Sequence, residues 1–110
     1  MKLPPTTLVA REKATRYLLV PQARGDKSRF LARAGYTLDE AETLLRDIRN
    51  QILPLDALPL ESNQYGQYYE IRGDLIGPNG VSLRVRTIWM AEHLSGRTRF
   101  VTLIPDKGTE

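Results

Sequence analysis

Hydrophobic positions recur at helical spacing in three stretches of the first half of the chain. They predict helices over about residues 8–19, 27–34 and 37–52. Thr7 is expected to cap the first helix and Asp26 the second, because a side-chain oxygen just before a helix can accept a free backbone N–H. A proline after the first stretch and a glycine after the second are expected to end these helices.

The third helix has the clearest signals. Thr37 and Glu40 have capping-box spacing, in which each side chain accepts the backbone N–H of the other. The apolar stripe of this helix is expected to face the core, and it consists of Ala41, Leu44, Leu45, Ile48 and Ile52. Pro54 and Pro59 then bracket a stretch to about residue 64, which we expect to be a long loop.

From Tyr65 onward, apolar and polar residues alternate as in half-buried strands. We expect one strand, the turn Pro78–Gly80, a second strand over 81–92 and a third over 98–104. If Gly77 faces Val81, the hairpin pairs Leu75 with Leu83, Ile71 with Thr87 and Tyr69 with Trp89 on one face, and Asp74 with Arg84 and Arg72 with Arg86 on the other. Register and pattern agree, since an odd shift would mix the two faces.

These elements predict an α+β fold in which three N-terminal helices pack on a three- to four-stranded antiparallel meander. A single domain covering residues 1–110 is expected, because a chain of this length builds one modest core.

Composition excludes several classes of protein. The chain has no cysteine, which rules out disulfides, thiolate metal sites and cysteine nucleophiles. No apolar run approaches the ~20 residues of a membrane span, and the start lacks the apolar core of a secretory signal, so we expect a cytoplasmic protein without membrane contact. His93 is the single histidine and has no partner at metal-ligand spacing, so neither a metal nor another cofactor is expected.

Positive charge is concentrated in the first third of the chain. Residues 1–36 hold eight basic and two acidic side chains, whereas residues 37–64 hold two basic and six acidic ones. Arginine outnumbers lysine by 12 to 4, and arginine is favoured where phosphate or carboxylate is held by two parallel hydrogen bonds. Either the basic third binds an anionic partner, or the two segments pair with each other across the surface.

The loop before the predicted second helix is the first candidate binding site. Arg24, Lys27 and Arg29 surround the start of that helix, where free backbone N–H groups attract anions. These three residues are candidate phosphate ligands, although the stretch lacks the full pattern of a nucleotide-binding loop. The alternative is an ordinary capped helix with solvated charges.

The polar face of the predicted sheet is the second candidate. Glu70, Arg72, Arg84 and Arg86 are expected about 5 Å from their neighbours across strands. Arginines that face each other need an anion between them, either an internal carboxylate or a bound phosphate, and Arg84 is a further candidate phosphate ligand. A glutamate base with arginines that stabilise a phosphorane is workable ribonuclease chemistry without a metal. A cross-strand salt-bridge ladder is the alternative.

Two tyrosines are candidates for stacking on bases, as in proteins that bind single-stranded RNA. They are Tyr65 and Tyr68, whereas Tyr69 and Trp89 are expected in the core. His93, near the end of a predicted strand, could act as an acid or base, but a lone histidine there is more typical of the surface.

Several segments resemble a family of small bacterial proteins catalogued only as a domain of unknown function. The matching segments are Lys2-Leu3-Pro4, Tyr17-Leu18-Leu19, Gly25-Asp26-Lys27-Ser28-Arg29-Phe30, Gly35-Tyr36, Tyr65-Gly66-Gln67-Tyr68-Tyr69-Glu70-Ile71, Gly77-Pro78-Asn79-Gly80, Thr87-Ile88-Trp89 and Phe100-Val101-Thr102-Leu103-Ile104-Pro105. Members occur near toxin–antitoxin and polymorphic-toxin loci, so the resemblance implies a toxin-related role. Many members carry a histidine where this chain has Gln22-Ala23-Arg24. If that histidine is catalytic, this chain would be weak or inactive.

The order of helices followed by a meander ending in a Val-Thr strand also resembles the barnase–EndoU–colicin–RelE group of metal-independent ribonucleases, as a fold-level analogy. By position, this resemblance implies phosphate binding by Lys27 and Arg29. It also implies polar site residues on the sheet at Glu70, Arg86 and Thr102.

Two functions follow as hypotheses. The first is a metal-independent, ribonuclease-like or RNA-binding toxin-type domain, with Glu70 as base and Arg86 as the transition-state stabiliser. The second is a non-enzymatic protein-binding module of a toxin–antitoxin-like pair, which the amphiphilic third strand and the acidic segment from Asp39 to Glu61 favour. The expected partners are therefore RNA and a cognate antitoxin or toxin, and a homodimer through the sheet edge would also fit.

Overall fold

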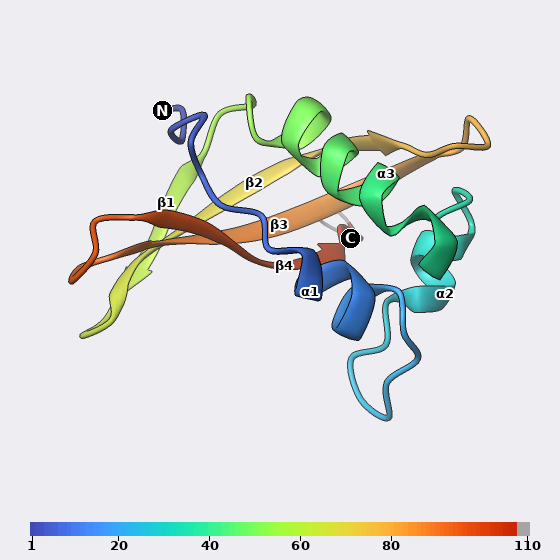
Figure 1. Cartoon of the computed structure of the whole chain (residues 1–110). Helices are drawn as coiled ribbons and strands as arrows, with labels where there is room; N and C mark the ends of the chain where they lie inside the picture. Colours follow the sequence, from blue (N-terminus) through green and yellow to red (C-terminus); the bar gives the residue numbers. More distant parts are fainter. Residues whose placement is uncertain (108–110) are drawn as a thin grey trace.

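The computed structural model describes residues 1–107, which form a four-stranded antiparallel sheet with the helical segments gathered on one face (Figure 1). The strands are β1 (Leu58–Ser62), β2 (Gly66–Ile76), β3 (Ser82–Glu92) and β4 (Thr98–Pro105). They lie side by side in chain order, so β1 and β4 are the edges. This is the α+β class with an antiparallel meander that the sequence predicts.

Three helical groups precede the strands in sequence. They are α1 (Arg11–Lys13) with η1 (Ala14–Leu18), then α2 (Ser28–Ala32), then η2 (Leu38–Glu40) with α3 (Ala41–Asp47) and η3 (Ile48–Ile52). The first of them begins only after an extended stretch, so the helices lie within the chain rather than at its N-terminal end. No helix among the described residues is long and apolar enough to cross a membrane.

The start of the first helix differs from the prediction. Thr7 does not cap it, because its hydroxyl donates to the Pro4 carbonyl at 2.6 Å and the helix begins at Arg11. The cause is tertiary: the Leu8 N–H donates to the Thr98 carbonyl at 2.9 Å, which holds this segment extended beside β4.

The predicted capping box of the third helical group is also wrong. Thr37 makes no side-chain cap, and the Glu40 carboxylate accepts a hydrogen bond from the Thr43 hydroxyl at 3.0 Å instead. The first turn is a 3₁₀ turn in which the Glu40 N–H donates to the Thr37 carbonyl at 2.8 Å. The apolar stripe is confirmed: Ala41, Leu44, Ile48 and Ile52 are buried, and Leu45 packs against the core.

The register of the central hairpin is confirmed in every predicted pair. The pairs are Leu75 with Leu83, Ile71 with Thr87, Tyr69 with Trp89, Asp74 with Arg84, and Arg72 with Arg86. The Gly77 N–H donates to the Val81 carbonyl at 3.0 Å, and Gly80 has a φ of 84°, the left-handed conformation that the turn requires.

The stretch expected to be a long loop contains strand β1. Leu58 pairs with Glu70 and Pro59 with Tyr69, and the register shifts before Ser62. A proline has no N–H to donate to a neighbouring strand, so Pro59 argues against a strand in the sequence. An edge strand tolerates a proline, and β1 lies at an edge of the sheet. Pro105 ends the other edge strand, β4, in the same way.

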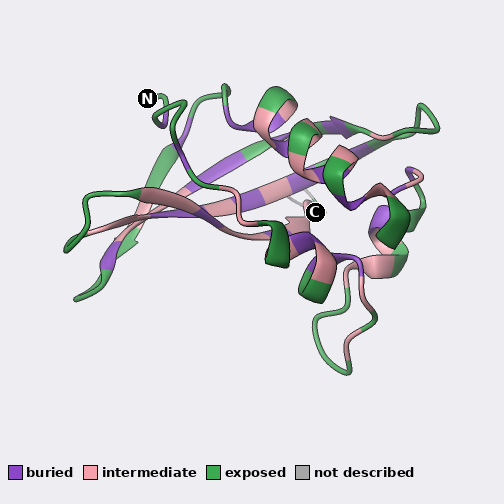
Figure 2. Ribbon diagram, viewed as in Figure 1, coloured by how far each residue is buried: buried purple, intermediate pink, exposed green. Residues whose placement is uncertain are grey.

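The core lies between the helices and the sheet. Trp89 is fully buried, and its ring packs edge-on against Phe100 with centroids 5.1 Å apart. Its indole N–H donates to the Thr87 hydroxyl at 2.7 Å. Figure 2 shows buried residues along the inner sides of the helices and the central strands, whereas the loop that joins η1 to α2 is mostly exposed.

Gly77→Ala is expected to destabilise the fold by about 3 kcal/mol, the upper end of the usual cost of overpacking. A Cβ at Gly77 would collide with the carbonyl oxygen of Ala34 and would lie 2.5 Å from its Cβ, and backbone atoms cannot move aside as a side chain can. The control is Gly80→Ala, where no atom lies within 4 Å and only the positive φ is strained, at about 1–2 kcal/mol. Urea unfolding of both variants checks this, and equal losses would contradict it.

Candidate functional site

The alternation of β2 and β3 turns four charged side chains to the face of the sheet opposite the core. This polar face consists of Glu70, Arg72, Arg84 and Arg86, with Asp74 and Asp106 at its border. Glu70 is 6% exposed, whereas the side chains of the three arginines are between 32% and 53% exposed. The carboxylate is therefore covered by guanidinium groups that solvent can reach.

Glu70 separates the two arginines that face each other across β2 and β3. The Arg72 Nε donates to Glu70 Oε1 at 2.7 Å, and the Arg86 Nε donates to Glu70 Oε2. Burial by itself raises the pKa of Glu70, but the hydrogen bonds and charges of Arg86 and Arg72 outweigh it, so the net pKa lies below its usual value. The group is ionised at neutral pH.

Further ion pairs lie around Glu70 and its two arginines. Asp106 lies 3.7 Å from Arg72 and 3.5 Å from Arg84, and Arg84 also reaches Asp74 at 3.5 Å. The sequence left open whether an internal carboxylate or a bound anion lies between the arginines, and in this structure Glu70 holds that position. The same geometry serves either a salt-bridge ladder or a base flanked by two cations.

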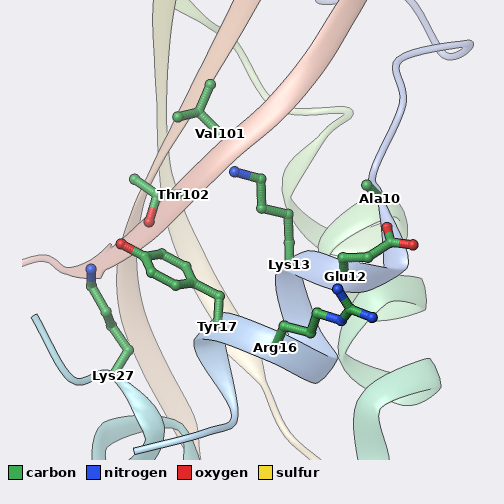
Figure 3. Close-up of a pocket in the computed structure, with 8 residues that line it drawn as sticks. All are labelled: Ala10, Glu12, Lys13, Arg16, Tyr17, Lys27, Val101 and Thr102. Carbon is green, nitrogen blue, oxygen red and sulfur yellow. The ribbon is translucent and has the colours of Figure 1, made fainter. Parts of the chain in front are cut away.

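Thr102 and Lys27 come together at the edge of β4, beside the first helix. Both line a cavity of about 510 Å³, which we call the α1–β4 cleft (Figure 3). Its lining residues are Ala10, Glu12, Lys13, Arg16, Tyr17, Lys27, Val101 and Thr102. A register shift opposite Ile88 lets the successive residues Val101 and Thr102 both face the cleft, as in a β-bulge.

The predicted site residues therefore fall into two groups. Glu70, Arg84 and Arg86 gather on the polar face, and Lys27 and Thr102 gather in the α1–β4 cleft. The groups are neighbours, because Ile88 pairs with both Glu70 and Thr102. Two strand spacings separate these last residues, about 10 Å.

The predicted phosphate cradle at the start of α2 is not assembled. Asp26 Oδ1 accepts hydrogen bonds from the Ser28 N–H at 2.9 Å and the Ser28 hydroxyl at 2.7 Å, so the chain's own carboxylate occupies that position. The helix has only five residues, which weakens its dipole. Arg29 lines a different hollow from Lys27, and Arg24 is exposed in the loop.

The loop for which the family resemblance implies a histidine has a structural side chain here. The Gln22 amide donates to the carbonyls of Tyr17 at 3.3 Å and Val20 at 3.1 Å, which satisfies free carbonyls at the end of η1. Gln22 thus ties the exposed loop to the first helix.

The two candidate stacking residues lie at different places. Tyr68 is half-buried and pairs with Met90 across the hairpin, two pairs along from Glu70 and on the same face. Tyr65 is 66% exposed in the turn before β2, where its carbonyl accepts the His93 N–H at 2.9 Å. His93 is exposed and its Nε2 lies 3.0 Å from the Asn63 carbonyl, so it takes no part in either group.

Three residues that line the cleft were not predicted as site residues from the sequence. Lys13, Arg16 and Tyr17 are spaced three and four residues apart, which places them on one side of a helix. Tyr17 is 42% exposed. The spacing was a usable signal, and only the position of β4 shows what the three residues face. Among residues 1–107, no three histidine or acidic side chains gather in a way that could hold a metal ion.

Comparisons with known proteins give a family and a fold. The sequence profile of a family described as "Domain of unknown function (DUF6883)" matches residues 3–107. Among curated proteins none matches the chain. A chain of the contact-dependent growth inhibition toxin–immunity protein complex from Klebsiella pneumoniae 342 is similar in structure, with a TM-score of 0.62 and 20% identity over 91% of this chain and 100% of that chain. At this identity the likeness shows a shared fold.

Proposed function

This chain belongs to the DUF6883 family, and we propose that it is a metal-independent ribonuclease of the toxin type. The polar face would carry the chemistry, and the neighbouring α1–β4 cleft would hold RNA beside it. The cytoplasmic location, the single-domain extent of residues 1–110 and a homodimer stay predictions.

One observation carries the proposal. Glu70 is an ionised carboxylate enclosed by two partly exposed arginines, Arg72 and Arg86, on the face turned away from the core. A base and two cations within hydrogen-bond reach of one another are the groups that phosphodiester transfer requires.

The reaction would use these groups in turn. Glu70 would take the proton from a ribose 2′-hydroxyl, whose oxygen attacks the adjacent phosphorus while the bond to the 5′-oxygen breaks. Arg86 and Arg72 would stabilise the negative charge that develops on the phosphorane oxygens. The leaving 5′-oxygen would take its proton from solvent, because the one histidine lies elsewhere. The products would be a 2′,3′-cyclic phosphate and a free 5′-hydroxyl.

Two further observations support the proposal. Lys27 and Thr102, the candidate phosphate and catalytic residues from other parts of the chain, share one cavity next to the polar face. The structural neighbour comes from a toxin–immunity protein complex, which agrees with the toxin-related role that the family resemblance implies.

A second candidate function is a non-enzymatic, immunity-like protein-binding module. The ion-pair ladder of Glu70, Arg72 and Asp106 favours it, because both carboxylates are already paired and the face needs no ligand to be stable. Such a module would bind a cognate toxin or antitoxin protein rather than RNA.

Incubation of the protein with total RNA in EDTA is expected to give discrete fragments with 2′,3′-cyclic phosphate ends. The double variant Lys27→Ala/Arg86→Ala is expected to cleave at least about a hundredfold more slowly, since one lost donor to a developing oxyanion costs this much. Arg46→Ala is the matched control, because Arg46 is an exposed arginine of α3, away from both groups.

Absence of cleavage by correctly folded wild-type protein would contradict the ribonuclease. The protein-binding module would then be tested by the salt dependence of partner binding. Affinity for RNA falls steeply as salt rises, whereas a largely apolar protein interface is much less sensitive.

A further inference from the structure

The α1–β4 cleft has an excess of positive charge that nothing in the described chain neutralises. Lys13, Arg16 and Lys27 line it with a single carboxylate, that of Glu12. Within residues 1–107, none of the three cations forms an ion pair. The cleft is therefore electrostatically incomplete without an anion.

Lys13 is the cation of the cleft that the missing anion affects most. It is partly buried on the helix side of the cleft, and the nearest charge that acts on it is the positive one of Arg99. Burial first, and then Arg99, lower the pKa of the Lys13 ammonium. A bound anion would relieve both effects, because it supplies opposite charge where water has been removed.

The cleft also offers hydroxyl groups. Thr102 Oγ1 is buried and is the one buried side-chain polar atom in residues 1–107 without a hydrogen-bond partner. In Figure 3 the hydroxyls of Thr102 and Tyr17 lie between the ammonium groups of Lys13 and Lys27. An oxyanion there would accept from the hydroxyls as well as from the cations.

An aromatic surface completes the site. The Lys27 Nζ lies 5.5 Å from the centre of the Tyr17 ring, a cation–π contact that holds this lysine at the mouth of the cleft. Tyr17 is partly exposed, and exposed aromatic rings beside lysines are what single-stranded nucleic acids stack on. A carboxylate of a protein partner would use the charges and leave the ring unused.

We propose that the α1–β4 cleft is a binding subsite for single-stranded RNA, in which Lys13, Arg16 and Lys27 hold a phosphate and Tyr17 stacks on a base. The inference rests on the proposed function and adds Lys13, Arg16 and Tyr17 to its binding residues. Thr102 and Glu70 share a row across the sheet, about 10 Å apart.

The test uses a fluorescein-labelled, 2′-O-methyl RNA pentanucleotide, which binds but offers no free 2′-hydroxyl to attack. The double variant Lys13→Gln/Arg16→Gln is expected to bind it about tenfold more weakly and to show a log K against log salt slope shallower by about 0.7, from one lost phosphate contact. Tyr17→Leu is expected to weaken binding about tenfold with the slope unchanged, because stacking releases no counterion. The charge-matched control is Arg33→Gln/Arg46→Gln, whose arginines are exposed outside the cleft.

The outcomes separate this inference from the proposed function. Wild-type affinity and slope in the cleft double variant would overturn the subsite, whether or not the protein cleaves RNA. Equal displacement of the pentanucleotide by a poly-glutamate peptide of the same charge would also overturn it and would assign the cleft to an acidic protein partner. Loss of pentanucleotide binding in the cleft variants, with no cleavage of total RNA by the wild type, would uphold the subsite and reject only the catalysis. In an active protein, the cleft variants are expected to raise KM about tenfold with kcat nearly unchanged.

Discussion

Glu70→Gln lowers the rate of RNA cleavage by about a hundredfold to ten thousandfold, the usual contribution of a general base. The amide keeps the size of the side chain but cannot accept the proton of the 2′-hydroxyl. Binding of the 2′-O-methyl pentanucleotide is expected to stay within about threefold of wild type, because Arg72 and Arg86 keep their charges and lie exposed beside the site. Single-turnover cleavage of a labelled RNA measures the first effect and fluorescence anisotropy the second.

The pH dependence of the same variant provides a further check. Because the arginines lower the pKa of Glu70, the acid limb of kcat/KM for the wild type is expected below about 4.3, the ordinary pKa of glutamate. The stability from these ion pairs is present above the unfolded-state pKa and is lost as the pH falls through the lower folded-state pKa. The thermal stabilities of wild type and Glu70→Gln are therefore expected to converge in acid and to separate toward neutral pH.

A loss of less than tenfold in Glu70→Gln combined with Arg86→Ala would reject the assigned roles. Parallel stability curves of wild type and Glu70→Gln at all pH values would contradict the lowered pKa instead. The two results are independent, so each tests a different step of the argument.

Trp89→Ala lowers the free energy of unfolding by about 3–5 kcal/mol, the largest loss expected from a single side chain of this fold. The indole is fully buried between the sheet and the helices, packs against Phe100 and donates to the Thr87 hydroxyl. Against a total stability of about 5–15 kcal/mol, this change removes a large part of the margin. Chemical denaturation followed by circular dichroism measures it.

Trp89→Phe is the matched control for this prediction. It keeps a ring against Phe100 and removes the indole N–H, whereas the Thr87 hydroxyl still donates to the Ile71 carbonyl at 2.8 Å. A loss of about 1–2 kcal/mol is expected, from one buried hydrogen bond and a smaller ring. If Trp89→Ala cost no more than Trp89→Phe, packing of the indole would not be the main source of stability.

Local sequence signals were reliable where the local environment decides the outcome. The hairpin register, the turn at Gly80 and the apolar stripe of α3 all match the structure, because period and turn chemistry fix them within a few residues. The cap at Thr7 was wrong because a contact with the distant Thr98 holds Leu8 extended, whereas the capping box at Thr37 was wrong because a local 3₁₀ turn and the Glu40–Thr43 hydrogen bond replace it. Strand β1 was missed because its ladder is shared with β2, and nothing within 58–62 reveals that partner.

One part of the candidate site could be predicted from the sequence and the other part could not. The cluster of Glu70 with Arg72 and Arg86 followed from the predicted register, since cross-strand neighbours in a hairpin are set by sequence spacing. The α1–β4 cleft did not follow, because residues near 13 and 102 meet only when β4 is placed as an edge strand beside the first helix.

The sequence by itself determined the α+β class, the meander and the charged face of its central hairpin, because side-chain period and turn residues act over short distances. Only the tertiary structure decided that Lys27 turns to Tyr17 and lines one cleft with Thr102. The physical reason is that a binding site made of separate segments depends on how helices dock against an edge strand. That docking is set by the shared core and leaves no local pattern in the chain.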